Sequence, residues 1–181
     1  MYELFVLGEL SIGPKHGYEL QYILKSTIGP FRQISSGTLY PLMSRLVGSG
    51  FITQRDEPQE GGRPRKRYEL TEAGRLRFHE LMTAPLEHGT DIGLTFQFKL
   101  NFFGYVDPRV QLDTLEQYLG YLQVDRKYIA ELEPQVRAKP GIPEPKRTQV
   151  LRMFSHRRCV TEAEIGWVTE EIDRLKRKPV I

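Results

Sequence analysis

The sequence predicts a mainly α-helical protein with one small β-hairpin, divided into two domains. Apolar residues recur every three or four positions over most of the 181 residues, which is the helical period. Two short runs at 51–55 and 68–70 flank a Gly- and Pro-containing turn, the pattern of a hairpin. Past about residue 90 the composition changes to a Phe-rich stretch followed by two long helical patterns.

The first half contains four predicted helices and the hairpin. Helices are expected over 2–11, 16–29 and 35–48, each ended by glycine or proline. A fourth helix opens at Thr71, a plausible N-cap, directly after the second strand. Three helices, a strand, a basic turn and a strand follow one another as in a winged helix-turn-helix domain, which we place at residues 1–88.

The second half, residues 89–181, is predicted to be a helical dimerisation domain that could also bind an effector. Asp107 and Pro108 start a long helix, and the Pro-rich segment 139–145 separates it from a last helix over 147–177. Two such helices would form an antiparallel pair whose apolar faces exceed what one pair can hide, so a homodimer is expected. The predicted dimer interface consists of Leu151, Phe154, Ile165, Val168, Ile172 and Leu175.

Composition excludes several classes of protein. The net charge is +3, a single cysteine (Cys159) excludes an internal disulfide framework, and the four histidines show no zinc spacing. No apolar stretch reaches the roughly 18 residues needed to span a bilayer. We therefore expect a cytoplasmic protein without a metal, cofactor or membrane span. No nucleophile, metalloprotease or phosphate-loop motif is visible, so we expect no enzyme.

Two segments have the chemistry of DNA binding. The third helix begins with the small residues Ser35, Ser36 and Thr38, where its free backbone N–H groups could approach phosphate, and Tyr40 could donate its hydroxyl. Four of the five residues at 63–67 are cationic, and Pro64 keeps this tip extended. Each segment alone is also compatible with a capped helix or a solvated hairpin. Their succession favours double-stranded DNA as the partner. The candidate DNA-binding residues are Tyr18, Ser35, Ser36, Thr38, Tyr40, Arg45, Arg63, Arg65 and Lys66.

The aromatic residues of the second half have two interpretations. Phe96, Phe102, Phe103 and Trp167 could line a pocket for an aromatic or amphipathic effector. Core packing is the more common role of such a cluster, and Trp167 also suits an interface. Cys159 lies beside arginines and could be redox-active, although a lone cysteine without a resolving partner is more often inert.

The motifs of the first half resemble the PadR family of transcriptional regulators. The resemblance covers roughly residues 2–80, through Leu7-Gly8-Glu9-Leu10, His16-Gly17-Tyr18-Glu19-Leu20, Gly37-Thr38-Leu39-Tyr40-Pro41-Leu42, Gly62-Arg63-Pro64-Arg65-Lys66 and Tyr68-Glu69-Leu70-Thr71-Glu72-Ala73-Gly74. It implies a homodimeric winged-helix repressor that binds a pseudo-palindromic operator and is released by a small molecule. It further implies base or backbone contacts from Ser36, Thr38 and Tyr40, a phosphate contact from Tyr18, and wing contacts from Arg63 and Arg65.

The expected function is therefore sequence-specific regulation of transcription. Two alternatives stay open at this stage. A winged helix can pack on a protein partner instead of DNA, and the helical half could carry or modify a small ligand. The basic third helix and wing favour DNA over the first alternative, and the lack of a convergent polar set in the second half disfavours the second.

Overall fold

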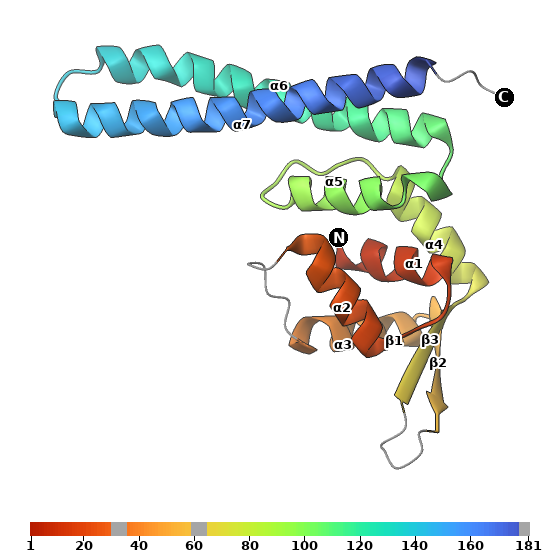
Figure 1. The fold of residues 1–181 in the computed structure, drawn as a ribbon. Coiled ribbons are helices and arrows are strands. Elements are labelled where there is room, and N and C mark those ends of the chain that lie inside the picture. Colours follow the sequence, from red (N-terminus) through yellow and green to blue (C-terminus); the bar gives the residue numbers. More distant parts are fainter. Residues whose placement is uncertain (30–35, 59–64, 178–181) are drawn as a thin grey trace. The chain divides into compact units, whose positions relative to one another are not determined.

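The computed structural model describes residues 1–29, 36–58 and 65–177. It confirms a mainly helical fold with a small antiparallel sheet (Figure 1). The elements in chain order are α1 (Tyr2–Ile12), β1 (Lys15–His16), α2 (Gly17–Ile28), α3 (Ser36–Gly48), β2 (Ile52–Glu57), β3 (Arg65–Leu70), α4 (Glu72–Thr83), α5 (Ile92–Asn101), the 3-10 turn η1 (Phe103–Tyr105), α6 (Pro108–Ala138) and α7 (Glu144–Arg177). Among the described residues no helix is long and apolar enough to cross a membrane.

Helix α1 is the centre of the first compact unit. Its residues from Leu4 to Leu10 are all buried, and Phe5, Val6 and Leu7 are completely so. Helices α2, α3, α4 and α5 and strand β3 all contact it. The core of this unit is therefore built around the first helix of the chain.

The sheet has three strands in the order β1-β3-β2, whereas the sequence predicted only the hairpin. The extra strand is the two-residue β1, which pairs antiparallel with β3 through Lys15 opposite Tyr68. Two residues are too short to show an alternating pattern, so sequence analysis could not find this strand. Strand β3 also begins at Arg65, earlier than predicted, so part of the basic run lies in the hairpin ladder.

The end of the hairpin is joined tightly to α4. The hydroxyl of Thr71 accepts a hydrogen bond from the Gly74 backbone N–H at 3.0 Å, which confirms the predicted N-cap. The Thr71 N–H in turn donates to the Phe51 carbonyl at 3.1 Å. Gly74 packs so closely here that a Cβ atom would lie 2.0 Å from the same Phe51 oxygen.

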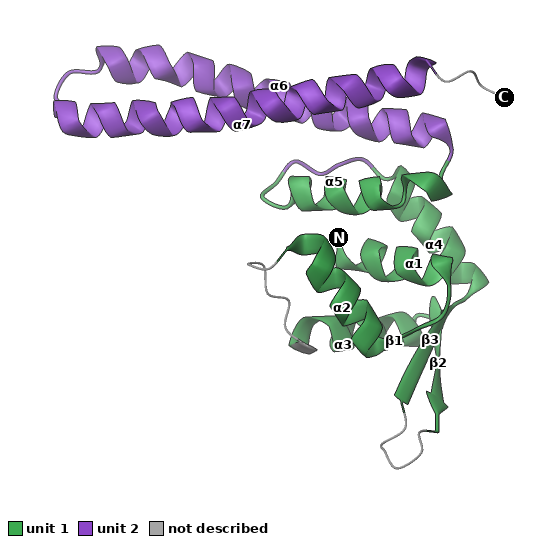
Figure 2. Cartoon of the chain, in the orientation of Figure 1, with its two compact units in different colours: residues 1–84, 89–106 green, residues 85–88, 107–181 purple. Residues whose placement is uncertain are grey.

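Helix α5 belongs to the first unit, which comprises residues 1–84 and 89–106, while the second comprises 85–88 and 107–181 (Figure 2). The boundary predicted at residue 88 thus differs from the structure. Phe102 lies against Gly8 of α1, where a Cβ atom would be 2.4 Å from its ring. The buried ammonium of Lys99 donates to the carbonyls of Met82 and Ala84 at the end of α4. The Phe-rich segment is therefore part of the first core.

The second unit is a hairpin of the two long helices α6 and α7. The carboxylate of Asp107 accepts a hydrogen bond from the Arg109 N–H at 2.7 Å, confirming the predicted helix start. The predicted apolar row of α7 is buried or partly buried, and its spacing is that of a coiled-coil seam. Its members are Leu151, Phe154, Arg158, Thr161, Ile165, Val168, Ile172 and Leu175.

The residues predicted to form the dimer interface are all members of this row. Within the single chain Phe154, Val168 and Ile172 are buried, whereas Leu151, Ile165 and Leu175 are only partly buried. Their contact with a second copy therefore stays a prediction, because heptad spacing shows which residues share a face but not which helix covers that face.

Arg147 stabilises the end of this hairpin at which a turn joins α6 to α7. Its guanidinium donates to four backbone carbonyls near the end of α6 and in the turn, at 2.6–3.2 Å: those of Val136, Arg137, Lys139 and Ile142. The last carbonyls of a helix lack partners within the helix, so these bonds stabilise the end of α6.

Replacing Gly74 by alanine should destabilise the first unit by about 1–3 kcal/mol, because the added methyl group meets backbone that cannot move independently. Gly48→Ala is the matched control, since a Cβ atom there has nothing within 4 Å. Urea unfolding followed by circular dichroism measures both variants. Equal midpoints for Gly74→Ala and the wild type would show that the turn from β3 into α4 can open without cost.

Arg147→Gln should destabilise the second unit by about 2 kcal/mol, because the shorter neutral amide cannot reach four carbonyls at once. The loss should be visible as faster hydrogen exchange in the last turn of α6. Arg152→Gln, an exposed position of the same helix, serves as the control. If both variants exchange at the wild-type rate, Arg147 does not hold the hairpin end.

Candidate nucleic-acid interface

Helix α3 presents one polar face and one buried face. Leu39, Met43 and Leu46 are buried in the core, whereas Thr38, Tyr40 and Arg45 are exposed. These three predicted DNA-binding residues therefore lie on the accessible side of the helix. Ser35 lies outside the described residues, and so does the side chain of Ser36, the first residue of α3.

Tyr40 connects α3 to the start of α2. A Cβ atom at Gly17 would lie 3.0 Å from the Cε1 atom of Tyr40, so the tyrosine ring covers the first residue of α2. The side chain of Tyr40 is nevertheless 40% exposed. The ring thus packs between two helices of the helix-turn-helix and still reaches the surface.

Three side chains stack at the junction of α2 and the hairpin. The rings of His16 and Tyr18 are nearly parallel, with centroids 5.5 Å apart and planes at 10°. The guanidinium of Arg65, on β3, lies 5.3 Å from the centroid of Tyr18. Tyr18, Arg65 and Lys66 are all exposed, and Arg63 lies outside the described residues. The structure therefore brings Tyr18 and the basic hairpin together.

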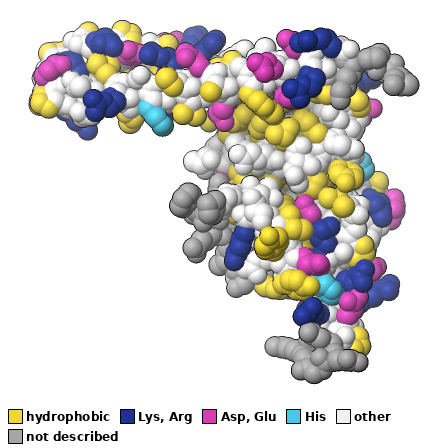
Figure 3. Space-filling view, viewed as in Figure 1, with side chains coloured by type: hydrophobic (Ala, Val, Ile, Leu, Met, Phe, Trp, Pro, Cys, Tyr) yellow, Lys and Arg dark blue, Asp and Glu magenta, His cyan; other side chains and the backbone are white. Residues whose placement is uncertain are grey.

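Glu57, the last residue of β2, organises the charges at the tip end of the hairpin ladder. Its carboxylate accepts a hydrogen bond from Arg67 at 2.8 Å, and its Oε2 atom lies 3.5 Å from Nε2 of His16. The Arg67 guanidinium holds the pKa of Glu57 below its usual value. One of the cations in the basic run is thus paired within the protein. Figure 3 shows dark blue, magenta and cyan side chains together at the hairpin.

Sequence analysis missed part of this surface. Tyr22 is 72% exposed and Lys25 is also exposed, four and seven residues after Tyr18, so the three lie on one face of α2. The spacing of polar aromatic and basic residues could have revealed this row. The roles of His16 and Glu57 could not be found that way, because their contacts join segments 41 residues apart in sequence.

The proposed effector residues belong to different units. Phe96 and Phe102 are buried in the first unit, and Phe102 is a member of its core. Phe103 is partly buried in the same unit, whereas Trp167 is 42% exposed on α7 of the second unit. Phe102 is therefore a packing residue. Among the described residues, no three His, Cys, Asp or Glu side chains converge as metal ligands would.

Comparison with known proteins gives consistent results. Residues 6–80 match the family model described as the transcriptional regulator PadR-like family. The chain is 32% identical over 143 residues to the negative transcriptional regulator PadR of Bacillus subtilis strain 168, covering 75% of this chain and 79% of that protein.

Several solved structures are similar to the chain. The crystal structure of Bacillus subtilis PadR in complex with operator DNA has 19% sequence identity and a TM-score of 0.44, with 96% of this chain and 98% of that chain covered. The same protein in complex with p-coumaric acid has 19% identity and a TM-score of 0.41, with 97% and 98% covered. A PadR family regulator from Eggerthella lenta DSM 2243 has 34% identity and a TM-score of 0.40, with 44% and 67% covered.

Proposed function

Because the chain belongs to the PadR-like family of transcriptional regulators, we propose that it is a sequence-specific DNA-binding repressor. The family consists of regulators and not of enzymes. The Bacillus subtilis relative is a negative regulator, which is the reason to propose repression over activation. A cytoplasmic location, where such a regulator would meet DNA, is part of the same proposal.

The main support for this proposal is that exposed polar and basic side chains cluster on α2, α3 and the hairpin. Helix α3 would enter the major groove with its first residues, Thr38 and Tyr40, toward the bases. Tyr18 would donate its hydroxyl to a phosphate from the neighbouring helix. Ser35 and Ser36 remain part of this proposal on sequence grounds alone.

The hairpin would act as the wing beside the groove. Arg65 and Lys66 are exposed cations on β3, suited to phosphates or to a narrow minor groove. Arg45 near the end of α3 would add a further phosphate contact. A winged helix that binds a protein partner is the alternative, but exposed arginine and lysine without exposed apolar neighbours on β3 favour a polyanion.

We propose that the second unit forms the homodimer through an exposed apolar face of the helical hairpin, beside the row of α7 predicted from the sequence. Glu164 accepts a hydrogen bond from Tyr118 at 3.2 Å, which marks one edge of the α6–α7 seam. Tyr121 stacks on Tyr118, at a centroid distance of 6.0 Å, so this residue lies at the same edge. Exposed apolar side chains continue from that edge on both helices: Val124, Tyr128, Met153, Val160 and Trp167.

These five residues fit one face of the hairpin. Val124 and Tyr128 follow Tyr121 by three and seven residues, and Trp167 follows Glu164 by three. Met153 and Val160 precede Trp167 at intervals of seven, so they lie in the same row of α7. A second copy covering this face would hide apolar side chains that are 42–65% exposed in the single chain.

Control by a small molecule completes the proposal. Bacillus subtilis PadR, the relative at 32% identity, has a crystal structure with p-coumaric acid. We propose that an aromatic or amphipathic effector likewise releases this protein from a pseudo-palindromic operator. Such a ligand would act by favouring a conformation with lower affinity for DNA.

Arg65→Ala should weaken binding to the DNA upstream of the protein's own gene about three- to tenfold and reduce the slope of log K against log salt by about one. The substitution removes one positive charge that would contact a DNA phosphate. Lys127→Ala, an equal change of charge on an exposed part of α6, is the matched control. Fluorescence anisotropy over a range of salt concentrations measures both variants. Wild-type affinity and slope in Arg65→Ala would remove the wing from the proposed mechanism.

Val160→Asp should convert the dimer to a monomer, because it places a charge in the apolar face described above. Cys159→Asp tests the specificity of that result, since the adjacent residue is also exposed but points about 100° away around the helix. Light scattering after size-exclusion chromatography gives the masses. A dimeric Val160→Asp, or a monomeric wild type, would contradict the proposed interface.

A further inference from the structure

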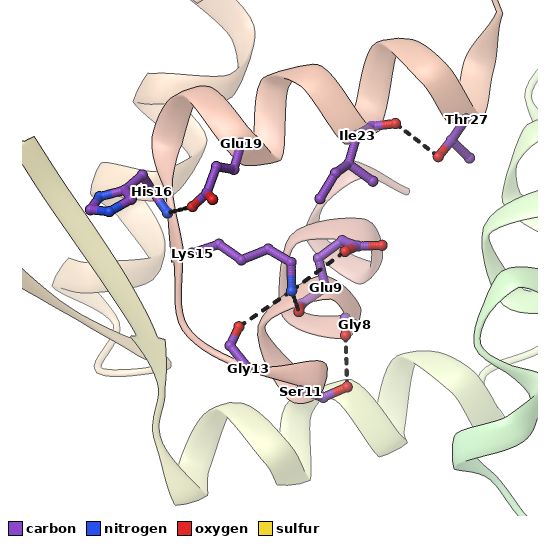
Figure 4. A network of polar contacts seen from close by, with 9 residues as sticks. All are labelled: Gly8, Glu9, Ser11, Gly13, Lys15, His16, Glu19, Ile23 and Thr27. Carbon is purple, nitrogen blue, oxygen red and sulfur yellow. Dashed lines mark hydrogen bonds and ion pairs between the residues drawn. The ribbon is translucent and has the colours of Figure 1, made fainter.

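His16 lies where β1 ends and α2 begins, and its backbone is fixed on two sides. Its N–H donates a hydrogen bond to Oε2 of Glu19 at 2.6 Å, and Figure 4 shows this bond at the first turn of α2. On β1, His16 is paired with Arg67 of β3 in the antiparallel register. Both contacts are made by the backbone of His16, so the imidazole ring is not needed to begin α2.

The imidazole ring of His16 contacts both strands of the hairpin. Its Nδ1 atom lies 3.4 Å from the carbonyl oxygen of Lys66 on β3, and its Nε2 atom lies 3.5 Å from Oε2 of Glu57 on β2. Arg67 donates to the other oxygen of Glu57, Oε1, so the two cationic groups do not compete for one atom. The side chain of His16 is only 18% exposed. The ring is thus held at the hairpin by two oxygen atoms.

The charge state of His16 decides how many of these contacts are hydrogen bonds. The Arg67 guanidinium holds the pKa of Glu57 below its usual value, so both nitrogen atoms of the ring face oxygen atoms that only accept hydrogen bonds. A neutral imidazole has one N–H donor, whereas the imidazolium ion has two. Only the protonated ring can therefore donate to the Lys66 carbonyl and the Glu57 carboxylate at the same time.

The neighbours of the ring do not share its titration range. Carboxyl, phenol, ammonium and guanidinium groups ordinarily titrate outside the range of about pH 6–8, whereas imidazole titrates within it. A change of pH across this range therefore alters the charge of the ring and not that of the groups around it. The ionisable side chains on the adjoining elements are Tyr18, Glu19, Glu57, Arg65, Lys66 and Arg67.

The His16 ring also connects to the side chains proposed to meet phosphate. It stacks on the ring of Tyr18, with planes at 10° and centroids 5.5 Å apart. The guanidinium of Arg65 lies 5.3 Å from the centroid of the same tyrosine. Because Tyr18 is 50% exposed, stacking on a fixed neighbour limits the orientations that its ring can take. His16 is that neighbour on α2, and Tyr18 in turn orients Arg65.

We propose that His16 is a positioning residue that orients Tyr18 and, through it, the Arg65 guanidinium. It does so most effectively as the imidazolium ion, which both the Lys66 carbonyl and the Glu57 carboxylate can bind. The consequence for DNA affinity rests on the DNA-binding function proposed above. Protonation strengthens the hold on the ring and adds a positive charge beside the phosphate-binding groups, so affinity for DNA rises as the pH falls.

An NMR titration of the wild-type protein without DNA tests the positioning and needs no substitution in His16. The Cε1 proton of His16 reports the charge of the ring, and the side-chain protons of Arg65 report the ring current of Tyr18. Tyr18→Leu gives the Arg65 signals in the absence of that ring. From about pH 8 to about pH 6 the wild-type Arg65 signals should move away from those of Tyr18→Leu, with the midpoint of the His16 signal. Arg65 signals that do not follow His16 would overturn the proposal.

His16→Ala provides an independent measurement in the free protein. It removes both nitrogen contacts and the stacking ring but keeps the backbone contacts, so α2 should still form. Its Arg65 signals should lie close to those of Tyr18→Leu at every pH in this range. His79→Ala removes an exposed imidazole from α4 of the same unit and should behave like the wild type. Wild-type Arg65 signals in His16→Ala would show that the stack forms without the imidazole, against the proposal.

Binding to the upstream DNA over the same pH range separates this inference from the proposed function. If the wild type binds specifically, lowering the pH should tighten binding by the wild type and His79→Ala about three- to tenfold more than binding by His16→Ala. An equal pH dependence in all three proteins overturns the functional consequence of the positioning. If the wild type shows no specific binding, the DNA-binding proposal fails, and the NMR titration still decides whether His16 orients Tyr18 and Arg65.

Discussion

The burial of α1 from Leu4 to Leu10 is the constraint on which the first unit depends. A helical stretch that is covered on every side must place glycine where a neighbour approaches closely, and Gly8 beside Phe102 is such a place. Because Phe102 follows α5, the core that begins at Tyr2 is completed only by residues near 102. Burial also leaves the last carbonyls of α1 without water, and the Lys15 ammonium satisfies that of Glu9. The winged helix and α5 therefore form one cooperative packing unit.

The same requirement to cover apolar surface explains the second unit. The sequence pattern predicted both long helices, the Pro-rich turn between them and the buried row of α7. It could not show which helix covers this row, since periodicity does not identify the covering element. Ile165, Val168 and Ile172 pack within the hairpin. Val160 and Trp167 lie in a neighbouring row of α7 and remain exposed.

Only part of the candidate nucleic-acid interface could be predicted, again because sequence patterns do not show which distant segments are in contact. Local sequence patterns were sufficient to predict the polar face of α3, the helix cap at Thr71 and the run of basic residues that begins β3. They were insufficient for β1, which has only two residues, and for contacts that join distant segments, such as His16 with Glu57 and Tyr18 with Arg65.

The arrangement of charge on the hairpin explains how a basic segment can be stable before it meets a polyanion. In the antiparallel register Arg55 lies opposite Arg67, which is unfavourable, and Asp56 lies opposite Lys66, which is favourable. Glu57 accepts the hydrogen bond of Arg67 and so compensates the first pair. Arg65, the first residue of β3, lies opposite Glu57 in this register and has the Tyr18 ring as a further neighbour. An aromatic face orients a guanidinium without neutralising its charge, so Arg65 remains positioned for an anion. Pre-positioning of this kind reduces the conformational entropy lost on binding. The acidic residues of β2 therefore stabilise the ladder next to the tip, where Glu57 binds Arg67, and the proposed role of Arg65 rests on its exposure and its contact with Tyr18.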